Sequence, residues 1–191
     1  MRLEPREASS LLLGRGSFLP SATCRAIVDE VMARAWWQRS EIGEAGASSV
    51  DMDTCNSLWC WLEGRYRQLV MTRLAVLAKA MGSLPGRPRL EEPIVLRYDR
   101  GGLFRRHNDE YERADHTRGR RMSLVVFLTS QGEPGGHEGG ELCFYVDDGR
   151  GETSIRFPGR AGEFVVFAAR VDHEVLPVRR GPRLTLVSWL Y

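Results

Sequence analysis

The second half of this 191-residue chain is divided into short strand-like segments, and this pattern constrains the fold more than any other feature. From Pro93 onwards, apolar and β-branched runs are separated by clusters of Gly, Pro and Asp, which end strands and form turns. We predict eight strands, at residues 94–98, 103–109, 123–129, 141–146, 153–157, 163–167, 173–178 and 184–190. Eight short strands behind a helical region predict a double-stranded β-helix, the jelly-roll or cupin-like shape.

Two helices are predicted before these strands. The first covers residues 24–35, where apolar side chains recur at helical spacing and Ser21 is placed to act as the N-cap. The second covers residues 58–81 and ends at the Gly- and Pro-containing stretch 82–88. The fold class is therefore α+β, mainly β, with the N-terminal helices packed on the outer face of one sheet.

We expect one domain over residues 1–191, with a helical support region at 1–92 and the β-helix core at 93–191. Hydrophobic residues make up 42% of the chain and charged residues 27%, which is an ordinary balance for a globular domain. The formal net charge is +2 with both signs interspersed, so no nucleic-acid partner is expected. The four cysteines lack zinc-type spacing, and no long apolar run indicates a membrane partner or export. A cytoplasmic location is the expectation, and the oligomeric state is left open.

Two histidines and one aspartate form a pattern with chemical meaning. His107 and Asp109 stand two apart on a predicted strand, so both side chains should point to the barrel interior. His173 begins a later strand. Two histidines with one carboxylate are the facial triad that holds non-haem Fe(II) and leaves coordination positions open. We therefore predict a metal site at His107, Asp109 and His173.

An arginine near the C-terminus supplies a second recognition element. Arg183 follows Gly181-Pro182 and opens the last predicted strand, where alternation directs Arg183 and Thr185 to one side. A guanidinium and a hydroxyl side by side suit one carboxylate. A buried guanidinium without an anion would be costly, so a bound carboxylate would explain it. A metal site beside a carboxylate site predicts an oxygenase that uses 2-oxoglutarate to activate O2.

Four sequence phrases in a fixed order carry a family resemblance. They are RYDRGGLFRRHND at residues 97–109, GGEL at 139–142, HEV at 173–175 and RLTLVSW at 183–189. The stretch from Tyr98 to the C-terminus resembles the prolyl-hydroxylase-like branch of the Fe(II)/2-oxoglutarate-dependent oxygenases. This resemblance covers roughly the last hundred residues.

The resemblance implies roles for individual residues. It implies iron at His107, Asp109 and His173, the C5 carboxylate of 2-oxoglutarate at Arg183, and Tyr98 as a hydroxyl neighbour of that cosubstrate. Some relatives carry a further tyrosine on the strand after the His-x-Asp turn, and the segment at 123–129 has none. In those relatives the tyrosine hydroxyl helps to hold the carboxylate. We give this role here to Thr185, with Tyr98 as a second candidate. Related halogenases replace the carboxylate by a small residue, so Asp109 favours hydroxylation.

The implied function is a 2-oxoglutarate-dependent dioxygenase that requires Fe(II), 2-oxoglutarate and O2, with ascorbate as a further candidate cofactor. Its first predicted reaction is hydroxylation of an unactivated C–H bond in a small polar or amino-acid-like substrate, releasing succinate and CO2. One alternative is hydroxylation of a protein or peptide residue such as proline. An alternative from another class is a non-catalytic cupin-like module that binds a metal or an anion.

Other chemically notable residues receive plainer interpretations. His116 and His137 lie in polar loops, and we expect both to be solvated. Trp59 and Trp61 stand two apart, and we favour packing against the core over a substrate platform. Substrate choice in such a fold depends on loops around the barrel mouth. The candidate lids are residues 44–60, residues 110–121 and residues 130–138.

Overall fold

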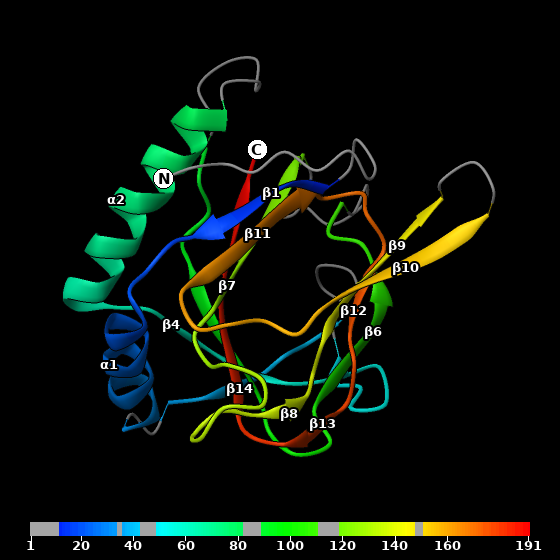
Figure 1. Ribbon diagram of the computed structural model, residues 1–191, viewed down its shortest axis with the longest axis horizontal. Coiled ribbons are helices and arrows are strands. Elements are labelled where there is room, and N and C mark those ends of the chain that lie inside the picture. The colour runs from blue at the N-terminus through cyan, green and yellow to red at the C-terminus, as the bar shows by residue number, and fades with distance from the viewer. Residues whose placement is uncertain (1–11, 34–35, 43–48, 82–88, 111–118, 148–150) are drawn as a thin grey trace.

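A computed structural model describes residues 12–33, 36–42, 49–81, 89–110, 119–147 and 151–191, which form two facing antiparallel sheets with two helices beside them (Figure 1). The larger sheet has the strand order β1 (Leu12–Ser17), β11 (Glu163–Ala168), β7 (Met122–Phe127), β14 (Arg183–Leu190), β5 (Ile94–Tyr98), β4 (Leu58–Trp61), β2 (Gln38–Arg39). The smaller sheet has the order β10 (Glu152–Phe157), β9 (Leu142–Asp147), β12 (His173–Val175), β6 (Leu103–His107), β3 (Cys55–Asn56). A separate pair joins β13 (Val178–Arg180) to β8 (Glu138–Gly139).

Both helices cover the outer face of the larger sheet. Helices α1 (Ser21–Met32) and α2 (Gly64–Met81) lie on the same side of the molecule, away from the smaller sheet (Figure 1). Alternation along the strands explains how they are held. Leu124 and Val126 of β7 belong to the core cluster that the helices complete, whereas Val125 and Phe127 belong to the cluster between the two sheets. Strand β7 is therefore apolar on both faces from Leu124 to Phe127.

The last strand shows how this alternation creates a site. Every residue of β14 is buried. Leu184 and Leu186 pack beneath the helices, while Arg183 and Thr185 line a small cavity between the sheets. The polar side chains thus share the interior with the apolar core between the sheets, as the alternation in the sequence predicts.

The structure corrects the predicted elements in several places. The segment 58–81 is not one helix, because residues 58–61 form β4 and pair with β5, and α2 begins only at Gly64, whose φ is +57°. The Ser21 cap is also wrong: Pro20 occupies the N-cap position, no side chain caps the helix, and α1 begins at Ser21.

Three further boundaries differ from the predictions. The strand predicted at 103–109 ends at His107, and Asp109 lies beyond it, where its backbone N–H donates to the carbonyl of Ala169 at 2.8 Å. The strand predicted at 173–178 is divided between β12 and β13, which join different sheets. The helical support region predicted at 1–92 also supplies β1, β2 and β4 to the larger sheet and β3 to the smaller one. The N-terminal region is therefore part of the β architecture as well as its cover.

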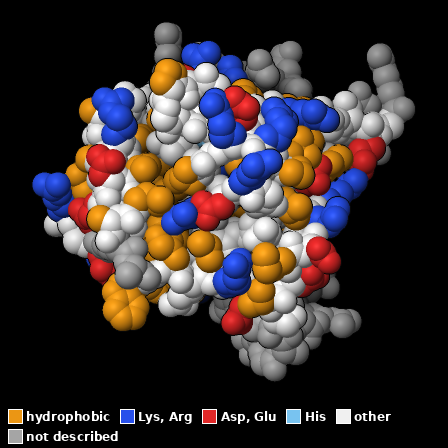
Figure 2. Space-filling model, turned by 90° about the horizontal axis from the view of Figure 1, so that it is seen from below, with side chains coloured by type: hydrophobic (Ala, Val, Ile, Leu, Met, Phe, Trp, Pro, Cys, Tyr) orange, Lys and Arg blue, Asp and Glu red, His pale blue; other side chains and the backbone are white. Residues whose placement is uncertain are grey.

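Charges of both signs are mixed on the face at the bottom of Figure 1. Figure 2 shows lysine or arginine side chains interspersed with aspartate or glutamate side chains, with hydrophobic side chains exposed between them. No helix in the described part of the chain is long and apolar enough to cross a membrane. The absence of nucleic-acid and membrane partners stays a prediction.

Candidate active site

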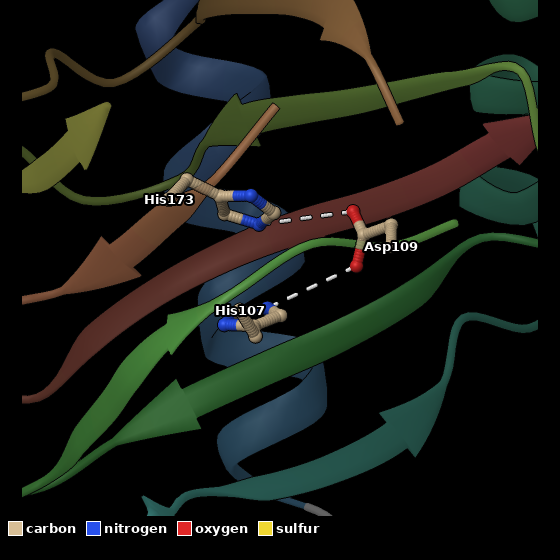
Figure 3. Close-up of side chains that lie close together, drawn as sticks. All are labelled: His107, Asp109 and His173. Atoms are coloured by element: carbon tan, nitrogen blue, oxygen red, sulfur yellow. Dashed lines mark ion pairs between the residues drawn. The ribbon is translucent and has the colours of Figure 1, made fainter. Parts of the chain in front are cut away.

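The two histidines and the aspartate meet inside the barrel (Figure 3). Their ligand atoms all lie within 4.8 Å of one another. The Nε2 atom of His107 is 3.8 Å from Oδ1 of Asp109, and the Nε2 atom of His173 is 3.7 Å from Oδ2 of the same carboxylate. Strand β6 carries His107 and strand β12 carries His173, so the smaller sheet supplies both imidazoles.

Backbone hydrogen bonds fix which nitrogen of each imidazole faces the cluster. His107 Nδ1 lies 2.8 Å from the carbonyl of Arg105, and His173 Nδ1 lies 2.9 Å from the carbonyl of Val171. A carbonyl only accepts, so each Nδ1 carries the proton and each Nε2 presents a lone pair to the cluster. This is the arrangement in which neutral imidazoles bind a metal ion.

The protonation states also suit a cation. Burial, and next the neighbouring His173, lower the pKa of His107 to about 4. Burial alone would raise the pKa of Asp109, but His173, His107 and a hydrogen bond from Ser123 outweigh it and lower that pKa. Near neutral pH His107 is therefore uncharged and Asp109 is a carboxylate, and together with His173 they form the donor set of a non-haem Fe(II) site.

Ser123 holds the carboxylate from the larger sheet. Its hydroxyl donates to Oδ2 of Asp109 at 2.5 Å, and the Ser123 side chain is completely buried. Sequence reasoning missed this residue, although a serine at the start of the apolar strand β7 was a visible signal. The hydrogen bond restrains the carboxylate in an orientation in which Oδ1 faces His107 and Oδ2 faces His173.

Arg183 is buried beside the triad. The side chain is 1% exposed, its Nε has no hydrogen-bond partner, and no carboxylate of the described residues forms an ion pair with it. Its guanidinium carbon lies 5.2 Å from the ring centre of Tyr98. Burial lowers the pKa of Arg183 to about 10, which leaves it charged near neutral pH. A buried, charged guanidinium with an orphaned donor fits a carboxylate ligand.

The remaining predicted site residues surround the same interior space. Tyr98 and Thr185 are each 1% exposed, and both line the small cavity with Arg183, His173 and Asp109. Burial raises the pKa of the Tyr98 phenol, so it stays protonated and can donate a hydrogen bond. The structure thus brings all six predicted site residues together around one cavity.

A larger cavity of about 390 Å3 adjoins the small one. His107 and Asp109 line both, so the triad lies where they meet. Trp59 and Trp61 form part of the wall of the larger cavity, with ring centres 5.3 Å apart in an edge-to-face arrangement and Trp61 48% exposed. The preference for core packing of this pair was therefore wrong, because Trp59 and Trp61 of β4 line the cavity beside Ile94 and Leu96 of β5.

Among the two remaining histidines, the structure decides the state of His137 alone. His137 is not solvated: it is 1% exposed, and its Nδ1 lies 3.0 Å from the hydroxyl of Thr129, because its loop folds back against the barrel. His116 lies outside the described residues, as do parts of the first two candidate lids.

Within the second lid, Arg120 is described and lines the larger cavity, where its guanidinium makes a two-pronged contact with Glu91 at 3.0 and 2.6 Å. The 130–138 loop does not appear among the residues that line either cavity.

The fold and the cluster together define the class of non-haem metal-dependent oxygenases built on a double-stranded β-helix. The family model described as the 2OG-Fe(II) oxygenase superfamily matches residues 93–191. The chain belongs to the 2OG-Fe(II) oxygenase superfamily. Its cofactors are therefore Fe(II), 2-oxoglutarate and O2, as predicted, and the prediction of a 2-oxoglutarate-dependent dioxygenase is confirmed. The requirement for ascorbate stays a prediction.

Curated relatives are named as hydroxylases. A PKHD-type hydroxylase of Maricaulis maris is 32% identical over 184 residues, which cover 94% of this chain and 68% of the relative. One from Methylobacterium nodulans is 36% identical over 105 residues, covering 53% of this chain and 43% of the relative. The chain thus spans about two thirds of the first relative and less than half of the second.

Solved structures support the same fold. A prolyl-4-hydroxylase of Pseudomonas putida superposes with a TM-score of 0.70 at 23% identity, covering 95% of this chain and 92% of that one. A prolyl hydroxylase of Trichoplax adhaerens, solved with a peptide fragment of hypoxia inducible factor, has a TM-score of 0.69 at 16% identity, covering 92% and 81%. The predicted double-stranded β-helix and its prolyl-hydroxylase-like branch are confirmed.

Proposed function

We propose that this chain hydroxylates a prolyl residue presented on a peptide or protein. The PKHD-type relative from Maricaulis maris and the prolyl hydroxylases among the similar structures support this alternative better than the small metabolite that we first predicted. The observation in the chain itself that carries the proposal is the tryptophan pair on the wall of the larger cavity. Flat aromatic walls suit the rigid, apolar pyrrolidine ring, as in other proline-recognition grooves.

The two Nε2 atoms of the histidines and the Asp109 carboxylate would hold the metal. Fe(II) bound there with 2-oxoglutarate and O2 would supply the oxidation of a C–H bond, with release of succinate and CO2. His107 and Asp109 border both cavities. A cosubstrate in the small cavity and a substrate in the larger one would therefore both lie beside His107 and Asp109.

Arg183 would pair with the distal carboxylate of 2-oxoglutarate, and Thr185 and the protonated Tyr98 would donate further hydrogen bonds. Pairing would satisfy the orphaned guanidinium donor and offset the cost of burying its charge. The apolar side chains that line the small cavity, among them Val125, Leu142 and Val175, would exclude water from the reacting atoms.

The test is a turnover assay with proline-rich peptides. The reconstituted enzyme should release succinate faster when a suitable peptide is added, and mass spectrometry should locate one added oxygen on proline. Trp59→Ala should raise the KM for the peptide by roughly tenfold and leave the KM for 2-oxoglutarate unchanged, because one aromatic contact is lost. Trp36→Ala is the matched control, since Trp36 is 83% exposed and does not line the cavity.

Two results would contradict the proposal. If free amino acids stimulated succinate release and peptides did not, the result would favour a small-molecule substrate instead. Equal effects of the Trp59 and Trp36 substitutions on the peptide KM would remove the tryptophan pair as its support.

A further inference from the structure

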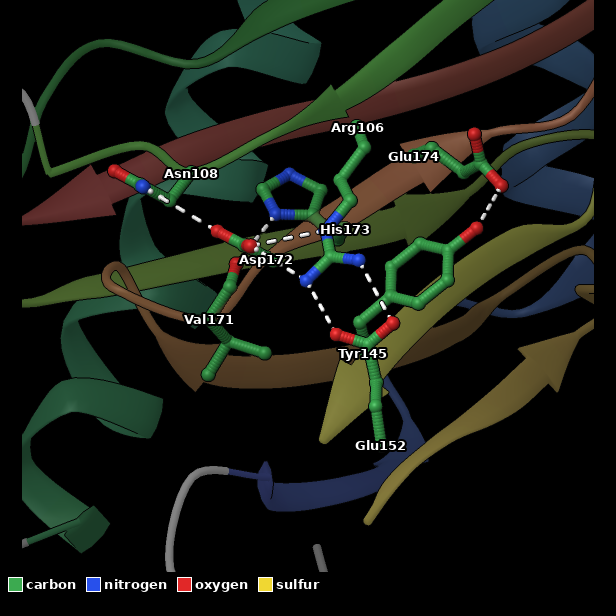
Figure 4. Close-up of polar contacts among 8 residues, drawn as sticks. All are labelled: Arg106, Asn108, Tyr145, Glu152, Val171, Asp172, His173 and Glu174. Carbon is green, nitrogen blue, oxygen red and sulfur yellow. Dashed lines mark hydrogen bonds and ion pairs between the residues drawn. The ribbon is translucent and has the colours of Figure 1, made fainter. Parts of the chain in front are cut away.

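The residue before each proposed metal ligand points out of the barrel, and the three meet in one polar network (Figure 4). They are Arg106 before His107, Asn108 before Asp109, and Asp172 before His173. Neighbouring residues of a strand point to opposite faces, so the inward His107 of β6 places Arg106 outward. What alternation alone does not explain is that these three predecessors contact one another.

Asp172 is the centre of this network. Its Oδ2 accepts hydrogen bonds from Nε of Arg106 at 3.0 Å and lies 2.9 Å from Nη2 of the same guanidinium. Its Oδ1 accepts a longer hydrogen bond from the side-chain amide of Asn108 at 3.4 Å. One carboxylate therefore joins the predecessors of all three ligands.

Arg106 extends the network across the smaller sheet. Its guanidinium makes a two-pronged contact with Glu152 of β10, with distances of 2.8 and 2.6 Å. It lies 4.3 Å above the ring centre of Tyr145 of β9, whose hydroxyl in turn donates to Glu174 of β12. The contacts thus link β6, β12, β9 and β10, which are consecutive in the sheet.

The exposure of these groups indicates what the network does. The Arg106, Glu152 and Asp172 side chains are 42%, 52% and 38% exposed. Water screens exposed ion pairs, so they contribute little to global stability. They do restrain the local backbone, because Arg106, Asn108 and Asp172 each share a peptide unit with a proposed metal ligand. Metal ligands must be held within a fraction of an ångström of the productive geometry, so such restraint matters at this place.

We propose that Asp172 is a positioning residue that aligns the three metal-binding side chains from the outer face of the sheet. Asp172 lines neither cavity, and it acts through Arg106 and Asn108. This inference rests on the metal site proposed above.

Binding of Co(II) to the metal-free protein tests it without turnover. Asp172→Ala should weaken Co(II) binding about tenfold, the low end of the effect of losing a group that orients metal ligands. It should also alter the visible d–d spectrum of the bound cobalt, which reports the ligand geometry. Asp172→Asn should have a smaller effect, because it keeps an oxygen for Asn108 but loses the charge that Arg106 contacts.

The matched control is Glu92→Gln, which disrupts the exposed two-pronged pair between Arg67 and Glu92 at 2.7 and 2.5 Å. That pair has similar exposure, 48% and 42%, and neither residue adjoins a ligand. Asp172→Ala and Glu92→Gln should lower the melting temperature of the metal-free protein by similar small amounts. Only the Asp172 variants should change the cobalt affinity and spectrum.

Cobalt affinity within twofold of the wild type and an unchanged spectrum in Asp172→Ala would overturn the proposal. If that variant does not fold, Asp172→Asn and Glu152→Gln replace it, and unchanged affinity in both would overturn the proposal equally. A wild-type protein that binds no Co(II) would instead contradict the metal site itself. The two failures are therefore distinguishable.

Discussion

His107 of β6 and His173 of β12 are opposite partners in the antiparallel pair of these strands, with ring centres 4.3 Å apart. Their side chains therefore point to the same face of the sheet at the same height. A slip of one residue in this register would turn one imidazole to the outside. The strand register therefore brings the Nε2 atoms of His107 and His173 together, and the loop that carries Asp109 has a smaller part in this.

Removing one imidazole should abolish metal binding. We expect His173→Ala to lose measurable Co(II) binding, because two remaining ligands hold a divalent ion poorly. His137→Gln is the control, since it also removes a buried histidine, but one outside the cluster. Equilibrium dialysis with metal analysis measures both variants. Equal metal content in the two would show that the cluster does not bind the ion.

The hydroxyl of Ser123 should contribute to metal affinity. Ser123→Ala removes the donor to Asp109, and we expect the Co(II) dissociation constant to rise about tenfold, as for other lost partners of ligating groups. Ser188→Ala on the neighbouring strand β14 is the control, because that buried hydroxyl donates to the backbone carbonyl of Glu91 instead. The two variants should have similar stability losses in urea. If both bind cobalt as the wild type does, Ser123 has no role in orienting the carboxylate.

Arg183 should determine the affinity for 2-oxoglutarate. Arg183→Ala should raise the KM for 2-oxoglutarate by roughly 10- to 100-fold, because a charge-assisted contact worth about 1.5–3 kcal/mol is lost. The KM of Arg183→Lys for 2-oxoglutarate should lie between those of the wild type and Arg183→Ala, since lysine keeps the charge without the two-pronged geometry. Arg180→Ala removes an arginine that is 72% exposed and paired with Glu138, and it should leave this KM unchanged. An unaltered KM in Arg183→Ala would contradict the assignment.

The stability of the metal-free protein should fall in mild acid because of His137. Burial, and next the positive charge of Arg183, lower the pKa of His137 to about 4, against about 6.5 in an unfolded chain. Between these values the unfolded chain holds the proton and the folded protein does not, so stability decreases as the pH falls from about 6.5 toward 4. The free energy of unfolding should drop between pH 7 and pH 5 by roughly 1–2 kcal/mol more in the wild type than in His137→Gln.

Urea unfolding of both proteins at several pH values measures this difference. His107 also titrates in this window, but it is present in both proteins, so it cancels in the comparison. Parallel pH profiles for the two proteins would contradict a buried, neutral His137.

The sequence by itself determined the β-rich core and the identity of the polar residues around the small cavity between the sheets. The alternation that places Arg183 and Thr185 on one face is local, because it depends only on the extended backbone of a single strand. The spacing of His107 and Asp109, with His173 on a later strand, likewise identified the three side chains that meet at the cluster. Local patterns sufficed for these residues because each pattern belongs to a short segment of chain.

Only the tertiary structure decided which remote segments support that site. Residues 58–61 have apolar side chains that suit a helix or a strand, and pairing with β5 made them a strand that carries Trp59 and Trp61 to the cavity. The burial of His137 and the hydrogen bond from Ser123 to Asp109 likewise depend on contacts between distant segments. Such contacts depend on strand pairing and sheet packing, which join residues remote in sequence, so no local pattern specifies them.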